Sequence, residues 1–172
     1  NLTELFALKK KWDSDEDKLG QDVFAPCLNL ADFYRGETGF LSDSVLTIWA
    51  PAIISLYQRD VKIQLLSSPN ISNYMRTVLQ DTLTVEDKQK ILQEMGENAL
   101  LAAFGLQNNP ENRTFRQQFF AYLIASNKLE IKFGMMRTEN FDDCHLLHYK
   151  RGYFEFENKS TIAHDGSANL TR

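Results

Sequence analysis

The sequence lacks the features of several protein classes. It contains only two cysteines, Cys27 and Cys144, far apart in the chain, which argues against a disulfide-stapled secreted domain and favours a reducing compartment. No apolar run approaches the roughly 18 residues that a membrane-spanning helix needs, and residues 2–11 are too polar for a signal peptide. We therefore expect a cytoplasmic protein without a membrane segment.

An excess of positive charge is also lacking. The 19 Lys and Arg residues are outnumbered by 23 Asp and Glu residues, which gives a net charge of −4. This balance excludes a broadly basic surface for nucleic acid, but not a local basic cleft. Basic residues do recur in the final third of the chain: Lys132, Arg137, Lys150, Arg151 and Arg172. The 172 residues fit one domain (1–172) with a core of its own.

Alternating and helical hydrophobic patterns predict an α/β fold, a mixed β-sheet flanked by helices. Four segments have the pattern of strands: residues 33–41, 61–66, 128–135 and 146–156. A helix predicted over 45–58, kinked at Pro51, joins the first two strands into a parallel crossover unit.

The remaining segments are predicted to be mainly helical. Residues 1–20 read as an N-terminal helix followed by an acidic linker, and residues 22–30 as a short helix or an extended arm around Pro26. A helical insertion is expected at about 70–126, with Thr84 and Asp87 as an N-terminal capping pair.

The end of the chain carries the groups that suggest chemistry. A hairpin is predicted from Phe154 and Phe156 through a turn at 157–159 to Ile162 and Ala163. On a strand, His148 and Lys150 would share one face. The returning strand would bring the segment that starts at Gly166 close to the imidazole of His148.

These residue types suit a phosphate. Lys150 offers a charged donor, Ser167 a hydroxyl and Asn169 an amide, while Gly166 allows backbone N–H groups to approach a ligand closely. A neutral imidazole at His148 could then attack phosphorus as a nucleophile. Such a site would need no metal and no cofactor.

The arrangement resembles a known motif. His148-x-Lys150, an acidic residue five positions later at Glu155, and Gly-Ser-x-Asn-x-Thr at residues 166–171 resemble the HKD motif of the phospholipase D superfamily. The form seen here is similar to the domain found in bacterial restriction nucleases and at the ends of DNA helicases. Two departures are visible: the family usually has Asp at the position of Glu155, and the interval from Glu155 to Gly166 is longer than the commonest spacing.

The resemblance implies roles for individual residues. In the family the histidine forms a covalent phosphohistidine and a second motif's histidine protonates the leaving oxygen. His148 would accordingly be the nucleophile or the acid, and Lys150, Ser167 and Asn169 would hold the phosphate; Glu155 completes the catalytic set. Gly166, Thr171 and Arg35 are further candidates for binding substrate. Arg35 and Glu37 lie on one face of the first predicted strand and could reach the active-site end, although an ordinary ion pair explains them equally well.

Two functions follow from the resemblance. The first is a metal-independent phosphodiesterase, an endonuclease acting on DNA as the nuclease module of a restriction or helicase-linked protein. One motif supplies one histidine, so a homodimer with a composite active site is expected. The alternative is a catalytically inactive DNA-binding or docking module of a helicase-type protein. A lipid phosphodiesterase is disfavoured because no exposed apolar surface is evident. The family continues beyond this motif, so we expect the full protein to extend past Arg172.

A metal site is an alternative use of the residues before Lys150. Cys144, His145 and His148 have ligand-type side chains at short spacings, with Asp142, Asp143 and His164 near. His164 is also close enough in sequence to the segment that starts at Gly166 to influence that pocket. On a strand His145 and His148 would point to opposite faces, which disfavours joint ligation. We therefore predict no metal.

Overall fold

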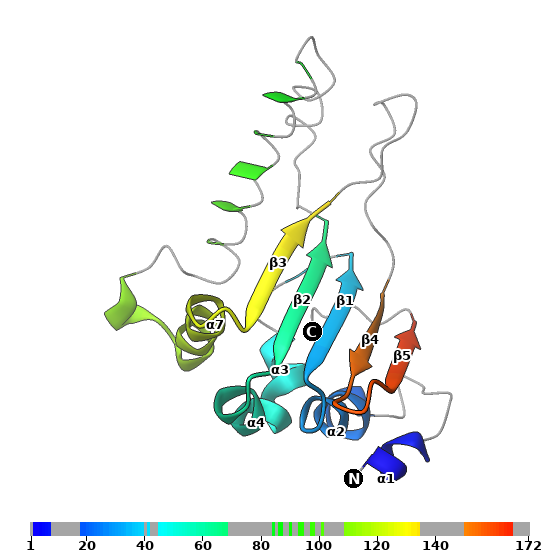
Figure 1. Ribbon diagram of the computed structural model, residues 1–172. Helices are drawn as coiled ribbons and strands as arrows, with labels where there is room; N and C mark the ends of the chain where they lie inside the picture. Colours follow the sequence, from blue (N-terminus) through cyan, green and yellow to red (C-terminus); the bar gives the residue numbers. More distant parts are fainter. Residues whose placement is uncertain are drawn as a thin grey trace.

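The protein forms a mixed five-stranded sheet with helices packed against it, shown by a computed structural model (Figure 1). The structure describes residues 2–7, 18–39, 41, 45–68, 84, 86–87, 90, 93–94, 97–98, 101, 109–134 and 150–166. The strand order is β3-β2-β1-β4-β5. The strands are β1 (Phe33–Thr38), β2 (Lys62–Ser67), β3 (Leu129–Phe133), β4 (Arg151–Glu155) and β5 (Thr161–Asp165). The predicted α/β class with a mixed sheet is confirmed.

The first half of the sheet is the predicted parallel unit. β1 pairs in parallel with β2, and β2 pairs in parallel with β3. The connection between β1 and β2 is one interrupted helix, composed of α3 (Val45–Trp49), a 3₁₀ turn η2 (Ala50–Ala52) and α4 (Ile53–Gln58). Pro51 stands in the first turn of η2, where its missing N–H disturbs no helical hydrogen bond. The predicted kink is therefore a tightened turn between two short helices.

The second half is the predicted hairpin. β4 pairs antiparallel with β5 on one side and with β1 on the other. The hairpin turn includes Lys159 at a positive φ of 62°, and the side chain of Asn158 accepts a 3.0 Å hydrogen bond from the Ser160 backbone N–H. Asn and Ser are typical of such turns because their side chains bond to nearby backbone groups. β4 begins at Arg151, so Lys150 lies immediately before it; residues 146–149 of the predicted strand lie outside the described residues.

The N-terminal segments are helical. They comprise α1 (Leu2–Phe6), a π-helical turn η1 (Gly20–Phe24) and α2 (Ala25–Leu28). Pro26 occupies the first turn of α2, which settles the choice left open by the sequence in favour of a helix. The predicted acidic linker, residues 13–17, falls outside the described residues.

The region predicted as a helical insertion is described in part. A 3₁₀ turn η3 (Pro110–Asn112) precedes α7 (Phe115–Ala125). Thr114 and Gln117 form a complete capping box at the start of α7. The predicted capping pair is also present, because the Asp87 backbone N–H donates to Thr84 Oγ1 at 3.2 Å.

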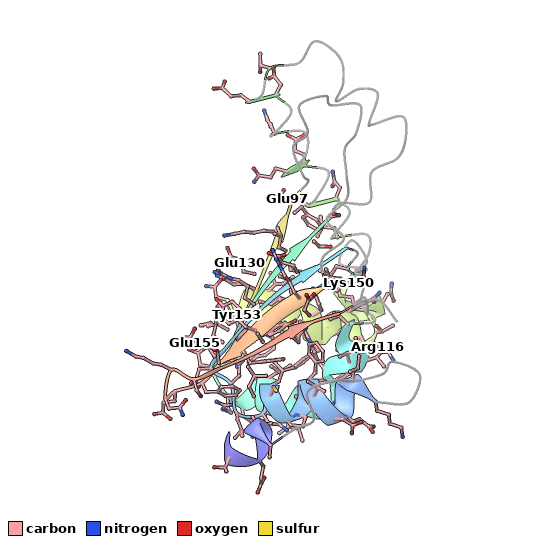
Figure 2. All side chains as sticks on the ribbon, turned by 90° about the vertical axis from the view of Figure 1, so that its right-hand side faces the viewer. Glu97, Arg116, Glu130, Lys150, Tyr153 and Glu155 are labelled. Atoms are coloured by element: carbon pink, nitrogen blue, oxygen red, sulfur yellow. The ribbon has the colours of Figure 1, made fainter. Side chains whose placement is uncertain are left out.

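One face of the sheet carries the core. Alternate residues of the strands point toward the helices, and the largest fully buried side chains come from both layers: Trp49, Tyr34, Phe120, Phe154, Leu28, Leu56, Ile63, Leu65, Leu123 and Val45. On the opposite face, Glu130, Tyr153 and Glu155 project away from the helices (Figure 2). We call this second surface the open face.

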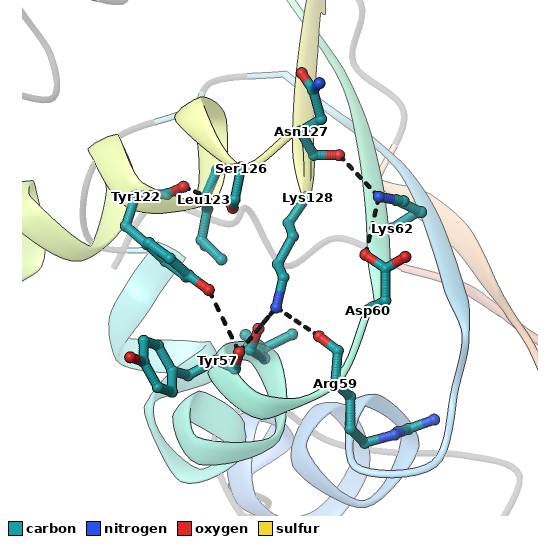
Figure 3. A network of polar contacts seen from close by, with 10 residues as sticks. Tyr57, Arg59, Asp60, Lys62, Tyr122, Leu123, Ser126, Asn127 and Lys128 are labelled. Carbon is teal, nitrogen blue, oxygen red and sulfur yellow. Dashed lines mark hydrogen bonds and ion pairs between the residues drawn. The ribbon is translucent and has the colours of Figure 1, made fainter.

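Lys128 ties the two helical connections together. Its Nζ donates hydrogen bonds to the backbone carbonyls of Leu56, Tyr57 and Arg59 at 3.0, 2.8 and 2.6 Å (Figure 3). These carbonyls belong to the last turn of α4, which has no intrahelical donors left for them and favours a positive charge. Lys128 precedes β3 directly, so this single side chain fixes the start of β3 to the end of α4.

Within the described ranges, no helix is both long enough and apolar enough to cross a membrane.

Candidate active site

The described ends of the predicted motif, Lys150 and Gly166, meet at one end of the sheet. β4 is antiparallel to β1, so Arg151 at its start pairs with Glu37 near the end of β1. β5 is antiparallel to β4, and Asp165 at its end pairs with the same Arg151. The start of β4 and the end of β5 therefore meet beside the carboxyl ends of the parallel strands. In open α/β sheets this edge is where ligands bind.

A backbone hydrogen bond joins the two motif segments at this edge. The Gly166 N–H donates to the Lys150 carbonyl oxygen at 3.1 Å. Lys150 is half-buried and Gly166 is exposed. We call this contact the Lys150–Gly166 link. Four of the predicted site residues adjoin it in sequence but lie outside the described part of the chain: His148, Ser167, Asn169 and Thr171.

The other two predicted residues lie elsewhere. The Arg35 guanidinium is on the open face and donates to Gln64 Oε1 at 2.6 and 3.1 Å, while its β1 neighbours Tyr34 and Gly36 are buried on the helix side. Glu155 is exposed and ends β4, five residues from Lys150, or about 17 Å along an extended strand. The structure does not bring Arg35 or Glu155 to the Lys150–Gly166 link. Glu37, the residue considered together with Arg35, instead pairs with Arg151 Nε at 2.8 Å.

A histidine lies next to the link on the helix side of the sheet. Tyr34 Oη and His164 Nε2 are 3.1 Å apart, although the two residues belong to strands separated by β4. Their rings are stacked at 5.9 Å between centroids. Phe24 from η1 and Phe154 from β4 also lie against the imidazole, at 5.2 and 6.0 Å. His164 thus lies among aromatic rings, two residues before Gly166.

Burial keeps this pair neutral. Desolvation lowers the pKa of His164 to about 4, and the neighbouring Asp165 carboxylate opposes the shift only in part. Burial raises the pKa of Tyr34 well above its ordinary range. At neutral pH the pair is therefore a phenol and an uncharged imidazole. Because a phenol is the stronger donor and an imidazole nitrogen the stronger acceptor, we assign the Tyr34 hydroxyl as donor to Nε2.

Two glycines make room for this contact. Gly36 of β1 and Gly152 of β4 face each other in register. A Cβ atom on Gly36 would collide with the Tyr34 hydroxyl, and one on Gly152 would lie 2.8 Å from His164 Nε2. A side chain at either position would close the space in which the Tyr34 and His164 side chains meet.

Buried hydroxyl residues end the parallel strands on the same side of the sheet. Thr38 and Ser67 pair in register at the ends of β1 and β2, and both are fully buried, as is nearly all of Ser68. Buried hydroxyls satisfy their hydrogen bonds within the protein; Ser67 Oγ, for example, donates to the Ser68 carbonyl at 3.4 Å. These residues therefore support the edge of the sheet and are not exposed to a ligand.

Metal ligands and thiols are the remaining groups of chemical interest. Within the described residues no cluster of three His, Cys, Asp or Glu side chains could hold a metal, and residues 142–145 and 148, weighed as zinc ligands, fall outside them. Cys27 is buried and free, and burial raises the pKa of its thiol to about 12. Cys27 is therefore a protonated core residue rather than a nucleophile.

Sequence reasoning placed His164 near the motif but did not find its partner. The alternation in β5 does contain the signal, because Ile162 and His164 fall on one face and the exposed Thr161, Ala163 and Asp165 on the other. Tyr34 is 130 residues away, and local periodicity carries no information about which strands pair.

The comparisons with known proteins give no family for the chain: no protein-family model matches it, and no curated protein matches it significantly.

Proposed function

We propose that this chain is a phosphodiesterase of the phospholipase D type that cleaves DNA without a metal. The observation that carries the proposal is the Lys150–Gly166 link. In the sequence, His148 stands two residues before Lys150, and Ser167 and Asn169 stand one and three residues after Gly166, so the motif residues flank this contact along the chain.

The proposed chemistry uses the side chains of the motif. Lys150, Ser167 and Asn169 donate hydrogen bonds to the non-bridging oxygens of a phosphodiester and stabilise the negative charge in the transition state. His148 attacks phosphorus, so a P–N bond forms while the P–O bond to the leaving group breaks. A second histidine protonates the leaving oxygen. Water then attacks the phosphohistidine, and the P–N bond breaks to regenerate the imidazole.

The second histidine is proposed to come from a second copy of the chain. A twofold dimer presents the same surface from each subunit, so two copies of His148 can face one phosphate across the axis. Within the motif, the sequence offers one histidine only. One copy serves as the neutral nucleophile and the other as the protonated acid, which requires their pKa values to differ.

His164 is not a candidate for the acid. An acid must carry a proton near neutral pH, whereas burial lowers the pKa of His164 to about 4. Its Nε2 is also engaged by the Tyr34 hydroxyl. The acid is therefore assigned to the partner's copy of the motif histidine rather than to this nearer ring.

Cleavage of supercoiled plasmid in excess EDTA tests this function. We expect nicked and linear products with the wild-type protein and none with His148→Ala. His145→Ala is the matched control, because it removes the neighbouring histidine and should cleave at the wild-type rate. Loss of cleavage in EDTA, or with His145→Ala, would indicate a metal-dependent site instead. Salt-sensitive DNA binding with no cleavage would favour the non-enzymatic DNA-binding module.

A further inference from the structure

β5 is the least supported strand at the candidate site. It lies at the edge of the sheet and pairs with β4 alone. Its residues Thr161, Ala163 and Asp165 are exposed, whereas Ile162 and His164 are half-buried. Ile162 packs against the core near the hairpin turn. His164 is therefore the only inward side chain of β5 near its end, two residues before Gly166.

The His164 contact crosses a whole strand. Tyr34 is on β1 and His164 on β5, and β4 runs between them. Their hydrogen bond passes over Gly152, which lies in register with Gly36 on one side and with His164 on the other. The bond thus holds the edge strand β5 to β1 in the centre of the sheet. It does so across Gly152, which lies two residues after Lys150.

We propose that Tyr34 and His164 are positioning residues that lock the register of β5 on β4 and so hold the Lys150–Gly166 link together. The consequence for catalysis rests on the proposed phosphodiesterase function, whereas the consequence for the link does not. Neither residue touches the phosphate in this proposal; both act by holding the two halves of the motif at one distance.

In such a hairpin, β5 could slip along β4 and change the register of their pairing. A slip of one residue would turn every β5 side chain to the other face of the sheet. A slip of two would put Gly166 opposite Gly152 in place of His164, and the buried Tyr34 hydroxyl would lose its acceptor. A buried hydroxyl without a partner costs about 1–3 kcal/mol. Apolar packing alone would tolerate small shifts, while the hydrogen bond accepts only one register.

The amide of Gly166 gives a direct test that needs no activity. Its N–H is the donor of the link, so its hydrogen exchange, measured by NMR, reports how often the link opens. We expect exchange of the Gly166 amide to be about tenfold faster in Tyr34→Phe and in His164→Leu, with the β2 amides of Ile63 and Leu65 unchanged. His164→Gln keeps an acceptor near Nε2 and should restore most of the protection. Tyr153→Phe removes a hydroxyl from the open face of the same hairpin and is the matched control.

A double-variant cycle separates the hydrogen bond from packing. If the two side chains act through their bond, Tyr34→Phe combined with His164→Leu should open the link no more than either change alone. Wild-type exchange in both single variants, or effects that multiply in the double variant, would overturn the proposal. Tyr34→Phe keeps the ring, so it remains informative should His164→Leu fail to fold.

Enzyme kinetics provide a second, independent test of the positioning role. On a short DNA duplex we expect Tyr34→Phe to lower kcat about tenfold with KM unchanged within twofold, and His164→Gln to retain more activity than His164→Leu. A rise in KM alone would contradict a positioning role. If the wild-type protein cleaves no DNA, the proposed function fails, while the exchange measurements still decide whether Tyr34 and His164 hold the link.

Discussion

Gly36 and Gly152 face each other across β1 and β4 directly beneath the hydrogen bond between Tyr34 and His164. An alanine at position 152 would place its Cβ 2.5 Å from the Arg35 carbonyl oxygen and 2.8 Å from His164 Nε2. Because the first of these is a backbone atom, the strand itself would have to move. The glycine at 152 is therefore needed for close approach of neighbouring atoms.

We expect Gly152→Ala to lower the free energy of unfolding by about 2 kcal/mol or more, as overpacking a filled site does. Urea denaturation at pH 7 measures it. Gly166→Ala is the matched control for stability, because its Cβ would meet no atom of the described residues within 4 Å and should change the free energy by less than about 0.5 kcal/mol. Equal stability of the two variants would show that the space above Gly152 is not filled as described.

Lys128→Met should destabilise the protein through α4. The substitution keeps much of the side-chain volume but leaves the carbonyls of Leu56, Tyr57 and Arg59 without their shared donor. A loss of about 1–3 kcal/mol is expected for such buried acceptors. Lys62→Met is the control, since Lys62 is exposed and pairs with Asp60 at the surface, where an ion pair contributes about 0–1 kcal/mol. A smaller loss in Lys128→Met than in Lys62→Met would contradict the assigned role of Lys128.

His164 should make stability fall as the solution becomes acidic. Its pKa is lowered from 6.5 to about 4 in the folded protein, so between these values the unfolded chain binds a proton that the folded chain does not. The stabilisation is complete above about pH 6.5 and is lost as the pH falls toward 4. Between pH 7 and 5 the wild-type protein should lose about 2 kcal/mol more than His164→Gln. Parallel pH profiles for the two proteins would mean that His164 is not desolvated.

The proposed dimer predicts how mixed subunits behave. When wild-type and His148→Ala chains are unfolded together and refolded, a composite site needs an intact histidine from both. Activity should then fall as the square of the wild-type fraction, so an equal mixture keeps about a quarter of the activity. A linear fall, with about half the activity in the equal mixture, would place a complete site in each chain.

The strands and their local connections could be predicted from the sequence because they depend on local patterns. Strand-like patterns predicted β1, β2 and β3, the helical pattern over 45–58 predicted the crossover, and the turn at 157–159 predicted the hairpin. These features are all confirmed. Each of them is set by residues close together in the sequence, where periodicity and turn chemistry carry the information.

The long-range contacts could not be predicted in this way. Nothing in the residues around Tyr34 indicates that β4 lies beside β1, or that His164 reaches across it. Lys128 begins the strand predicted over 128–135, and nothing in that pattern indicates that it is buried against the three carbonyls at the end of α4. The positions of His148, Ser167, Asn169 and Thr171 lie outside the described residues, so their roles stay predictions.

In the proposed mechanism, His148 becomes covalently attached to the phosphate of DNA. Internally radiolabelled DNA can be mixed with the protein in EDTA, quenched in alkaline denaturant that preserves phosphohistidine, and separated by gel electrophoresis and peptide mass spectrometry. We predict that label moves to the protein, maps to His148 and is absent from His148→Ala. Cleavage of DNA with no labelled protein, or label that persists in His148→Ala, would show that His148 is not the nucleophile.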